Sequence, residues 1–254
     1  LNLPIYRQYL RWISNAIHGD FGESLVSKSP VIKEIAKKFP ATLILVGMAL
    51  LMIVVVTIII GVLCAIYKDS AFDNLTRVVT ILGISIPNFW LGFMLLFVFA
   101  VRLKVVPVVG YGSLKNVILP SVTLAVAISA SSIRLLRSNM LENMNKDYVM
   151  YAKARGVPKN KIIWKHILKN AMPPMITLFG QTIGYMIAGT AIVESVFSWP
   201  GIGSYAVSAI FARDLPVINA YVLIMAVIFV ICNLSADIVN AALNPQMLKE
   251  SGDI

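Results

Sequence analysis

The chain has 254 residues, of which 58% are hydrophobic and only 13% are charged. Soluble domains are about 45–50% apolar and about 25% charged, because they need a charged surface. The composition therefore excludes a disordered chain, a secreted disulfide scaffold and an ordinary cytosolic enzyme, and indicates a polytopic α-helical membrane protein. The net charge of +10 comes from the loops, and no basic stripe interleaved with aromatic residues indicates nucleic-acid binding.

The chain begins with a segment that is too polar to cross a bilayer. Apolar residues recur at helical spacing over residues 5–17, so we expect an amphipathic helix on the membrane or on an outer docking face. Residues 1–40 are expected to be extracytoplasmic. Because the sequence starts with Leu1 and its apolar runs are odd in number, we also expect the chain to be a fragment or to lack a first helix.

Long runs without charged residues follow. About 20 apolar residues are needed to cross a hydrocarbon core, and backbone groups in lipid must be satisfied within a helix or a closed barrel. The run Leu50–Val56 does not alternate as barrel strands do. We therefore expect an all-α transmembrane bundle over residues 41–245. Its five expected spans are 41–67, 78–101, 117–134, 172–193 and 217–240.

The charged loops indicate the orientation of these spans. The stretch from Arg134 to Lys169 holds nine basic residues and two acidic ones, which favours the cytoplasm by the positive-inside rule. Alternation then places residues 1–40 outside and a tail at 246–254 in the cytoplasm. The six basic residues of the 1–40 segment conflict with this assignment, and its length and three acidic residues only soften the conflict.

The basic stretch contains an unusual turn between two short helices. A helical pattern stops at Gly156, which can adopt the left-handed conformation that ends helices, and Pro158 suits the start of a second helix. Pro173 and Pro174 then open the next span. The pattern predicts a compact bend outside the membrane within a loop at 135–171.

This bend is one of seven segments that together carry a resemblance to a known family. Tyr151-Ala152-x-x-x-Gly156, followed by His166-x-Leu168-x-Asn170-Ala171-x-x-Pro174, resembles the coupling loop of ABC importer permeases, although the family's usual first Glu is Tyr151 here. Six further segments resemble the dipeptide/oligopeptide/nickel branch of that family, in the expected order. These are Gly19–Ser24, Phe39–Leu43, Ser85–Gly92, Leu119–Leu124, Glu194–Gly203 and Ala212–Val217.

The resemblance implies a permease subunit in the cytoplasmic membrane that imports short peptides or nickel complexes. Its implied partners are a second similar permease, two cytoplasmic ATPases, an extracytoplasmic binding protein and the lipid bilayer. The resemblance assigns no catalytic residue to this chain, and we expect no metal ligand and no cofactor in it. Because the chain has no phosphate-binding loop, ATP with Mg is expected on the ATPases. The residues expected to couple to an ATPase are Asp147, Tyr151, Ala152, Gly156, His166 and Asn170.

Other residues are candidates for the transport path or for packing. Pro87 would kink the second span, and Asn88 and Trp90 beside it are pathway candidates. Gln181 is a pathway candidate in the fourth span, among glycines that favour close helix packing. Glu194 is expected near the membrane interface, solvated and structurally paired.

The sequence leaves other interpretations of the basic loop and of the function open. The lysines of the basic loop could serve only to set topology and meet anionic lipid. A secondary transporter driven by an ion gradient is the main alternative function, although no convincing internal repeat is visible. An intramembrane enzyme would need paired acids, a Ser–His pair or a metal motif inside the spans, and both histidines lie outside them.

Overall fold

The computed structural model describes residues 4–243 of the chain. Within them the backbone forms helices and loops, and one isolated antiparallel bridge joins Glu23 to Pro30. The expected all-α class is confirmed, and the expected tail at 246–254 lies outside the described residues. The helices, of which η1 and η2 are π-helical, are α1 Ile5–Ile17, α2 Val31–Ile66, α3 Ala71–Ser85, α4 Asn88–Leu95, η1 Leu96–Arg102, α5 Leu114–Met144, α6 Asp147–Ala154, α7 Lys159–Lys161, η2 Ile162–Ile167, α8 Leu168–Ala171, α9 Pro173–Gly189, α10 Ala191–Val196, α11 Ile202–Phe211 and α12 Leu215–Leu243.

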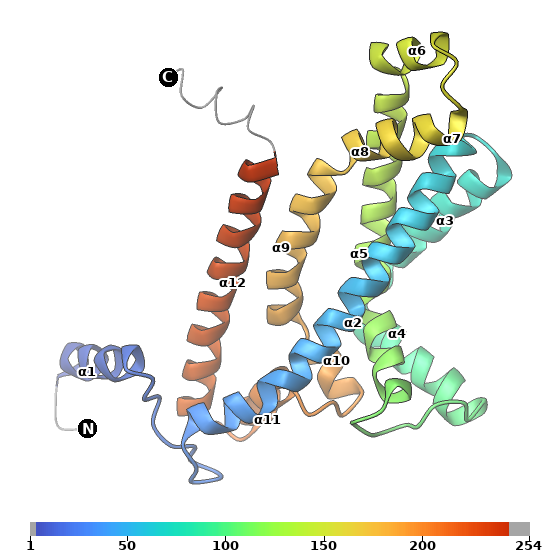
Figure 1. Cartoon of the computed structure of the whole chain (residues 1–254). Helices are drawn as coiled ribbons and strands as arrows, with labels where there is room; N and C mark the ends of the chain where they lie inside the picture. The colour runs from blue at the N-terminus through green and yellow to red at the C-terminus, as the bar shows by residue number, and fades with distance from the viewer. Residues whose placement is uncertain (1–3, 244–254) are drawn as a thin grey trace, which may run out of the picture.

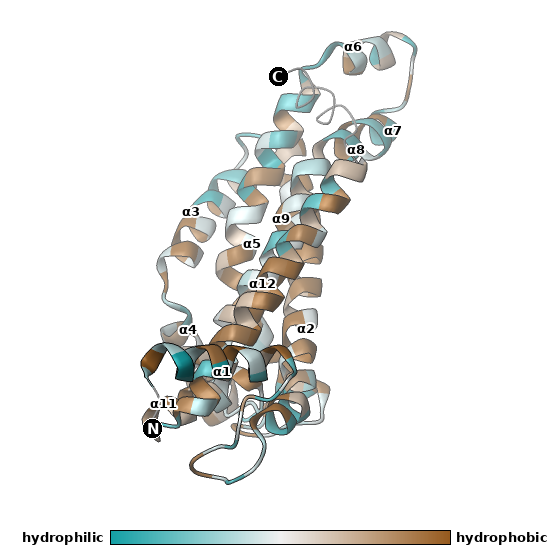
Figure 2. Ribbon diagram, turned by 90° about the vertical axis from the view of Figure 1, so that its left-hand side faces the viewer, coloured by the Kyte–Doolittle hydropathy of each residue, from teal (hydrophilic) through white to brown (hydrophobic). Residues whose placement is uncertain are grey.

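The long helices α2, α5 and α12 run along the molecule and are apolar enough to cross a membrane. Helices α2 and α5 pack against each other along much of their length, while α9 lies between them and α12 (Figure 1). Fully buried side chains such as Leu45 and Ile53 of α2 and Leu136 of α5 form the core. Figure 2 shows hydrophobic residues along these helices and hydrophilic residues mainly at the two ends of the bundle.

The span expected over 78–101, with a kink at Pro87, is broken into two helices in the structure. Helix α3 ends at Ser85, α4 begins at Asn88, and the two parts are bent by 105°. Pro87 causes the break, because a proline disfavours the helical conformation of the residue before it, and Ile86 is extended with φ −82° and ψ 123°. In this respect the expectation that Pro87 bends the chain is confirmed, but the result is a break between two helices.

The expected span over 172–193 is also divided, between α9 and α10. Helix α9 has 17 residues, a length of about 26 Å at 1.5 Å per residue, which is less than the roughly 30 Å of a hydrocarbon core. By length and composition three helices of the described chain can cross a membrane, or four if the bent pair counts as one span. The sequence led us to expect five.

The two ends of the bundle differ in character. Helices α6, α7 and α8 lie at one end together with the turn between α2 and α3, and the last described turn of α12 points toward the same end (Figure 1). Helices α1 and α11 lie at the opposite end. Helix α1 covers the range expected for an amphipathic helix and lies across the direction of α12 (Figures 1 and 2), with Ile5 and Ile17 largely exposed.

Candidate functional site

Helices α6, α7, η2 and α8 form an elbow, residues 147–171, whose bend is fixed by a helix cap. Gly156 has φ +73°, a left-handed conformation that costs other residue types about 1–2 kcal/mol. Its N–H donates to the carbonyl of Lys153 at 2.9 Å, and the N–H of Val157 donates to the carbonyl of Ala152 at 3.1 Å. These two bonds define a Schellman motif. The spacing of Ala152 and Gly156 therefore has a structural reason, because they are two fixed positions of one cap.

The second arm begins directly after this cap. Pro158 is the N-cap residue of α7, and its carbonyl accepts the N–H of Ile162 at 3.0 Å. Ile162, Ile163 and Ile167 are buried, as is Val149 on the first arm, so the apolar sides of both arms face inward. Because both arms are anchored by buried side chains, the elbow is a packed element that can transmit a displacement.

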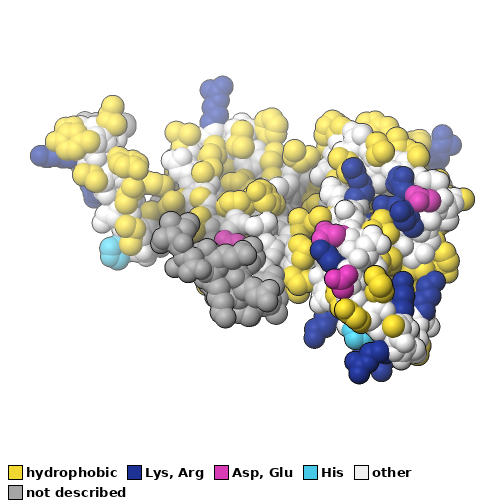
Figure 3. Space-filling model, turned by 90° about the horizontal axis from the view of Figure 1, so that it is seen from above, with side chains coloured by type: hydrophobic (Ala, Val, Ile, Leu, Met, Phe, Trp, Pro, Cys, Tyr) yellow, Lys and Arg dark blue, Asp and Glu magenta, His cyan; other side chains and the backbone are white. Residues whose placement is uncertain are grey.

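The outward side of the elbow carries most of the residues expected to couple to an ATPase. Tyr151 is 72% exposed, and Asp147 is exposed in the first turn of α6, where a negative charge is favourable. Asn170 is exposed on the second arm, while Ala152 and His166 are partly buried. Seen from this end, Lys and Arg side chains gather over the region of the elbow (Figure 3). The structure thus places all six expected coupling residues in one element.

Part of the loop expected at 135–171 is helical. Helix α5 continues past the bundle to Met144, and Asn143 accepts the hydroxyl of Tyr148 on α6 at 2.9 Å. An exposed ion pair joins Glu142 to Lys146 at 2.9 Å. The elbow is therefore attached directly to the end of the long helix α5.

The four pathway candidates do not form one site. Pro87, Asn88 and Trp90 are exposed at the break between α3 and α4, and α4 packs on α5 and α10. Gln181 is partly exposed on α9, which packs mainly on α12 and α2. Any path that they share has to be completed by other elements.

A buried charge cluster that no local sequence pattern indicates lies near the elbow end of α3 and α5. The Asp73 carboxylate is fully buried, and Arg137 donates to both of its oxygens at 2.7 Å. Arg77 donates to Asp73 and to Asp69, each at 3.1 Å. A planar guanidinium on a carboxylate in this two-bond geometry is a strong, directional pair. It joins α3 to α5, which lie 64 residues apart at this contact.

Glu194 at the opposite end is fully buried, so the expectation that it is solvated is wrong. Its carboxylate accepts the Thr42 hydroxyl at 2.6 Å and the Ser204 N–H at 2.9 Å. Trp199 donates from its indole N–H to the carbonyl of Ala41 at 2.8 Å. A Cβ on Gly201 would clash with Glu194, which explains the glycine in the Trp-Pro-Gly turn. The expectation of a structural role for Glu194 agrees with these contacts.

A second buried carboxylate at this end belongs to Asp214, in the turn between α11 and α12. It accepts the hydroxyl of Ser24 and the N–H of Leu25 at 3.1 Å. Burial pushes the pKa of Asp214 upward, but these hydrogen bonds, together with backbone donors of Val26 and Val217, outweigh burial and leave the pKa below its ordinary value. Two family motifs, 19–24 and 212–217, therefore meet at this carboxylate.

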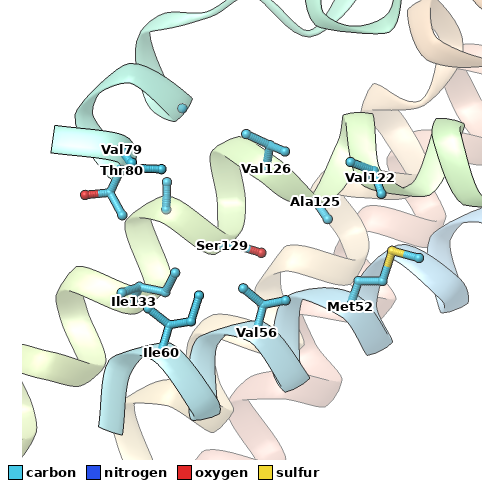
Figure 4. Close-up of a pocket in the computed structure, with 12 residues that line it drawn as sticks. Met52, Val56, Ile60, Val79, Thr80, Val122, Ala125, Val126, Ser129 and Ile133 are labelled. Atoms are coloured by element: carbon cyan, nitrogen blue, oxygen red, sulfur yellow. The ribbon is translucent and has the colours of Figure 1, made fainter. Parts of the chain in front are cut away.

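An apolar cavity of about 260 Å³ opens between α2, α3 and α5 (Figure 4). Met52, Val56 and Ile60 line it from α2, while Val122 and Val126 lie opposite on α5. Such a cavity offers almost no group that could bind a polar solute.

Comparison with known proteins decides what this arrangement belongs to. Residues 57–249, more than half of the chain, match the family described as binding-protein-dependent transport system inner membrane component. The chain belongs to this family. The glutathione transport system permease protein GsiC of Escherichia coli strain K12 is 39% identical to this member over 245 residues, which cover 96% of this chain and 80% of GsiC. GsiC of Shigella flexneri serotype 5b has the same identity and coverage.

Two solved transporters share the fold of this family member. The MetNI methionine ABC transporter in an inward-facing conformation aligns with a TM-score of 0.69 and 17% identity, over 82% of this chain and 95% of that chain. An amino acid ABC transporter with histidines aligns with a TM-score of 0.58 and 15% identity, over 84% and 94%. The chain is thus the permease subunit of an ABC importer, a multi-pass inner-membrane protein of a family that works with ATPase and substrate-binding partners.

Proposed function

We propose that this permease imports short peptides. The supporting observation is the 39% identity to glutathione permeases over 96% of the chain, since glutathione is itself a small peptide. The motifs that resemble the dipeptide/oligopeptide/nickel branch favour the same class of cargo. Nickel complexes, the other cargo of that branch, are the competing outcome of the experiment below.

The proposed complex contains this chain, a second similar permease, two ATPases at the elbow end and a binding protein at the end of α1 and α11. ATP and Mg are bound and used by the ATPases. The C-terminus lies on the cytoplasmic side, which is supported by the position of the last described turn of α12 at the same end as the basic elbow (Figure 1). The exposed residues Asp147, Tyr151 and Asn170 contact the ATPase directly.

The elbow converts closure of the ATPases into movement of the spans. Ala152 and Gly156 fix the angle between its arms, and the buried isoleucines of η2 attach the second arm to the bundle. A rigid element of this kind passes on a displacement without absorbing it. His166 lies in η2, partly buried, and is part of the proposed coupling element. The exposed residues beside the break, Pro87, Asn88 and Trp90, contribute to the path at its outer part.

Reconstitution with the partner subunits tests this function. Proteoliposomes that contain both permeases and both ATPases would be supplied with the cognate binding protein and either labelled glutathione, labelled dipeptides or nickel. We expect peptide uptake that requires ATP on the side of the membrane where the ATPases lie. We also expect this uptake to stimulate ATP turnover. Nickel uptake without peptide uptake would contradict the proposed cargo. Peptide uptake by this chain alone, driven by an ion gradient without ATP, would instead identify a secondary transporter.

A further inference from the structure

Helix α9 presents four different sides to its surroundings. One side is buried in the bundle through Met175, Phe179 and Met186, and a second packs against α12 through Gly180 and Gly184. The third side, with Ile176 and Ile183, lines an apolar cavity shared with α2 and α12. The fourth side is polar.

Thr177, Gln181 and Tyr185 recur every fourth residue along α9 and therefore share this fourth side. We call these three residues the α9 polar face. The Thr177 hydroxyl donates to the carbonyl of Pro173 at 3.3 Å. By contrast, the Gln181 amide and the Tyr185 hydroxyl make no hydrogen bond to any residue between 4 and 243, and Tyr185 is 64% exposed.

Hydrocarbon is an unsuitable neighbour for this face. A lipid-exposed amide and hydroxyl would lose their hydrogen bonds to water without compensation, whereas the isoleucine side of the same helix loses nothing. Two unpartnered polar groups on successive turns therefore indicate water or a polar ligand beside them. Both groups can donate and accept hydrogen bonds and neither is charged, a chemistry that matches the amide N–H and carbonyl groups of a peptide backbone.

The same helix is joined directly to the elbow. Backbone dihedrals stay helical at the junctions of the second arm, at Ile162, Leu168 and Met172. Pro173 and Pro174 follow at once, and their fixed φ angles stiffen the joint. A displacement of the elbow therefore reaches the α9 polar face through one connected stretch of helices.

We propose that the α9 polar face is a wall of the translocation path, where Gln181 and Tyr185 hydrogen-bond the backbone of a passing peptide. This inference rests on the proposed function for its peptide ligand. Closure of the ATPases displaces the elbow, and the elbow is connected directly to α9. Peptide binding to the α9 polar face and displacement of that face are therefore coupled without the participation of other helices.

Thiol accessibility separates this face from the apolar side of the helix. The background is the full complex with Cys64→Ala and Cys232→Ala, checked for transport. Gln181→Cys and Tyr185→Cys are compared with Ile176→Cys and Ile183→Cys as matched controls on the same helix. We expect a membrane-impermeant thiol reagent to modify positions 181 and 185 in either the nucleotide-free or the ATP-bound state, and to leave 176 and 183 unmodified. Inertness of 181 and 185 in both states, or their disulfide cross-linking to the second permease instead, would overturn the proposal.

Peptide protection and uptake kinetics test the ligand separately. Saturating binding protein loaded with peptide is expected to slow modification of Gln181→Cys, and Gln181→Leu is expected to raise the KM for peptide uptake by roughly tenfold, the loss of about one hydrogen bond. Accessible but unprotected cysteines, together with uptake of nickel only, would mean that the peptide cargo is wrong. If peptide uptake persists while the cysteines at 181 and 185 remain unmodified, the α9 polar face does not line the translocation path.

Discussion

At the residue scale, Gly156 is the position where the backbone itself demands one residue type. No neighbouring atom lies within 4 Å of a Cβ at this site, and only the φ of +73° makes a side chain costly. We expect Gly156→Ala to destabilise the elbow by about 1–2 kcal/mol and to lower uptake per ATP hydrolysed. Gly156→Asn should retain more coupling, because Asn tolerates the left-handed conformation.

The matched control for this prediction is Gly47→Ala. Gly47 also has free space around its Cβ position, but it lies inside α2 with an ordinary helical φ. Uptake per ATP should be unchanged in this variant. Equal losses in Gly156→Ala and Gly47→Ala would show that the cap does not matter.

Asp73 and Arg137 make the shortest ion pair among the described residues, at 2.7 Å. Removing one partner leaves the other charge buried and uncompensated, so Asp73→Asn should destabilise the protein by about 3 kcal/mol. We expect a large positive coupling in a double-mutant cycle with Arg137→Gln, measured by thermal unfolding in detergent. The exposed pair Glu142–Lys146 is the control, and its removal should produce no measurable change. Additive losses at Asp73 and Arg137 would contradict the pairing.

The Asp214 carboxylate ties the 22–30 loop to the start of α12, and this tie depends on pH. Its pKa in the folded protein lies below the ordinary 3.8, so its stabilising contribution is present above about pH 4 and is lost as the pH falls through the folded pKa. Asp214→Asn should therefore expose the loop to protease at pH 7, where the parent loop stays protected. Similar cleavage rates for variant and parent at pH 7 would show that the tie is not formed.

These residues differ in how far the sequence predicts them. The cap at Gly156 is local, so the spacing of a glycine and a proline is sufficient to predict it. The Asp73–Arg137 pair and the Thr42–Glu194 bond join residues that are 64 and 152 positions apart. No local pattern specifies such partners. From its sequence position alone, Glu194 is predicted to be an acidic residue at the membrane interface, and its burial follows only from its contacts in the fold.

At the element scale, the contact between α9 and α12 depends on small residues. A Cβ on Gly180 would lie 2.7 Å from the Cβ of Ala236, so Gly180→Ala should cost about 1–3 kcal/mol through overpacking. Ala236→Gly in the same chain should restore much of that loss, because it returns the missing space. Thermal unfolding of the two single variants and the double variant measures this. A double variant that is less stable than both single ones would show that the helices meet elsewhere.

Apolar runs predict that helices exist, but they do not predict where a helix breaks. The run 78–101 is uniformly charge-free, and yet Pro87 divides it because Ile86 cannot stay helical. In the same way, charges after Arg134 indicate a loop, while α5 remains helical to Met144 because residues beyond the membrane can still form a solvated helix. Hydropathy therefore predicts whether a segment lies in lipid or in water, but it does not predict where its helices begin and end.

At the scale of the whole molecule, the fold class and the family follow from the sequence alone, since composition and ordered motifs extend over nearly the entire chain. The bend at Gly156 between two short helices is also predicted correctly as an element, and its coupling role stays a prediction. The α9 polar face is predicted only at Gln181, because recognising a shared face requires knowing which sides of the helix are already covered.

The side of the membrane on which the elbow lies is the most direct test of its proposed coupling role. Tyr151→Cys in a background without native cysteines would be treated with an impermeant thiol reagent in intact cells and in inside-out vesicles. We expect modification only in inside-out vesicles, and protection when the partner ATPases are bound, because we propose that the exposed tip of the elbow is their docking site on the cytoplasmic side. Modification of this cysteine from outside intact cells would contradict it.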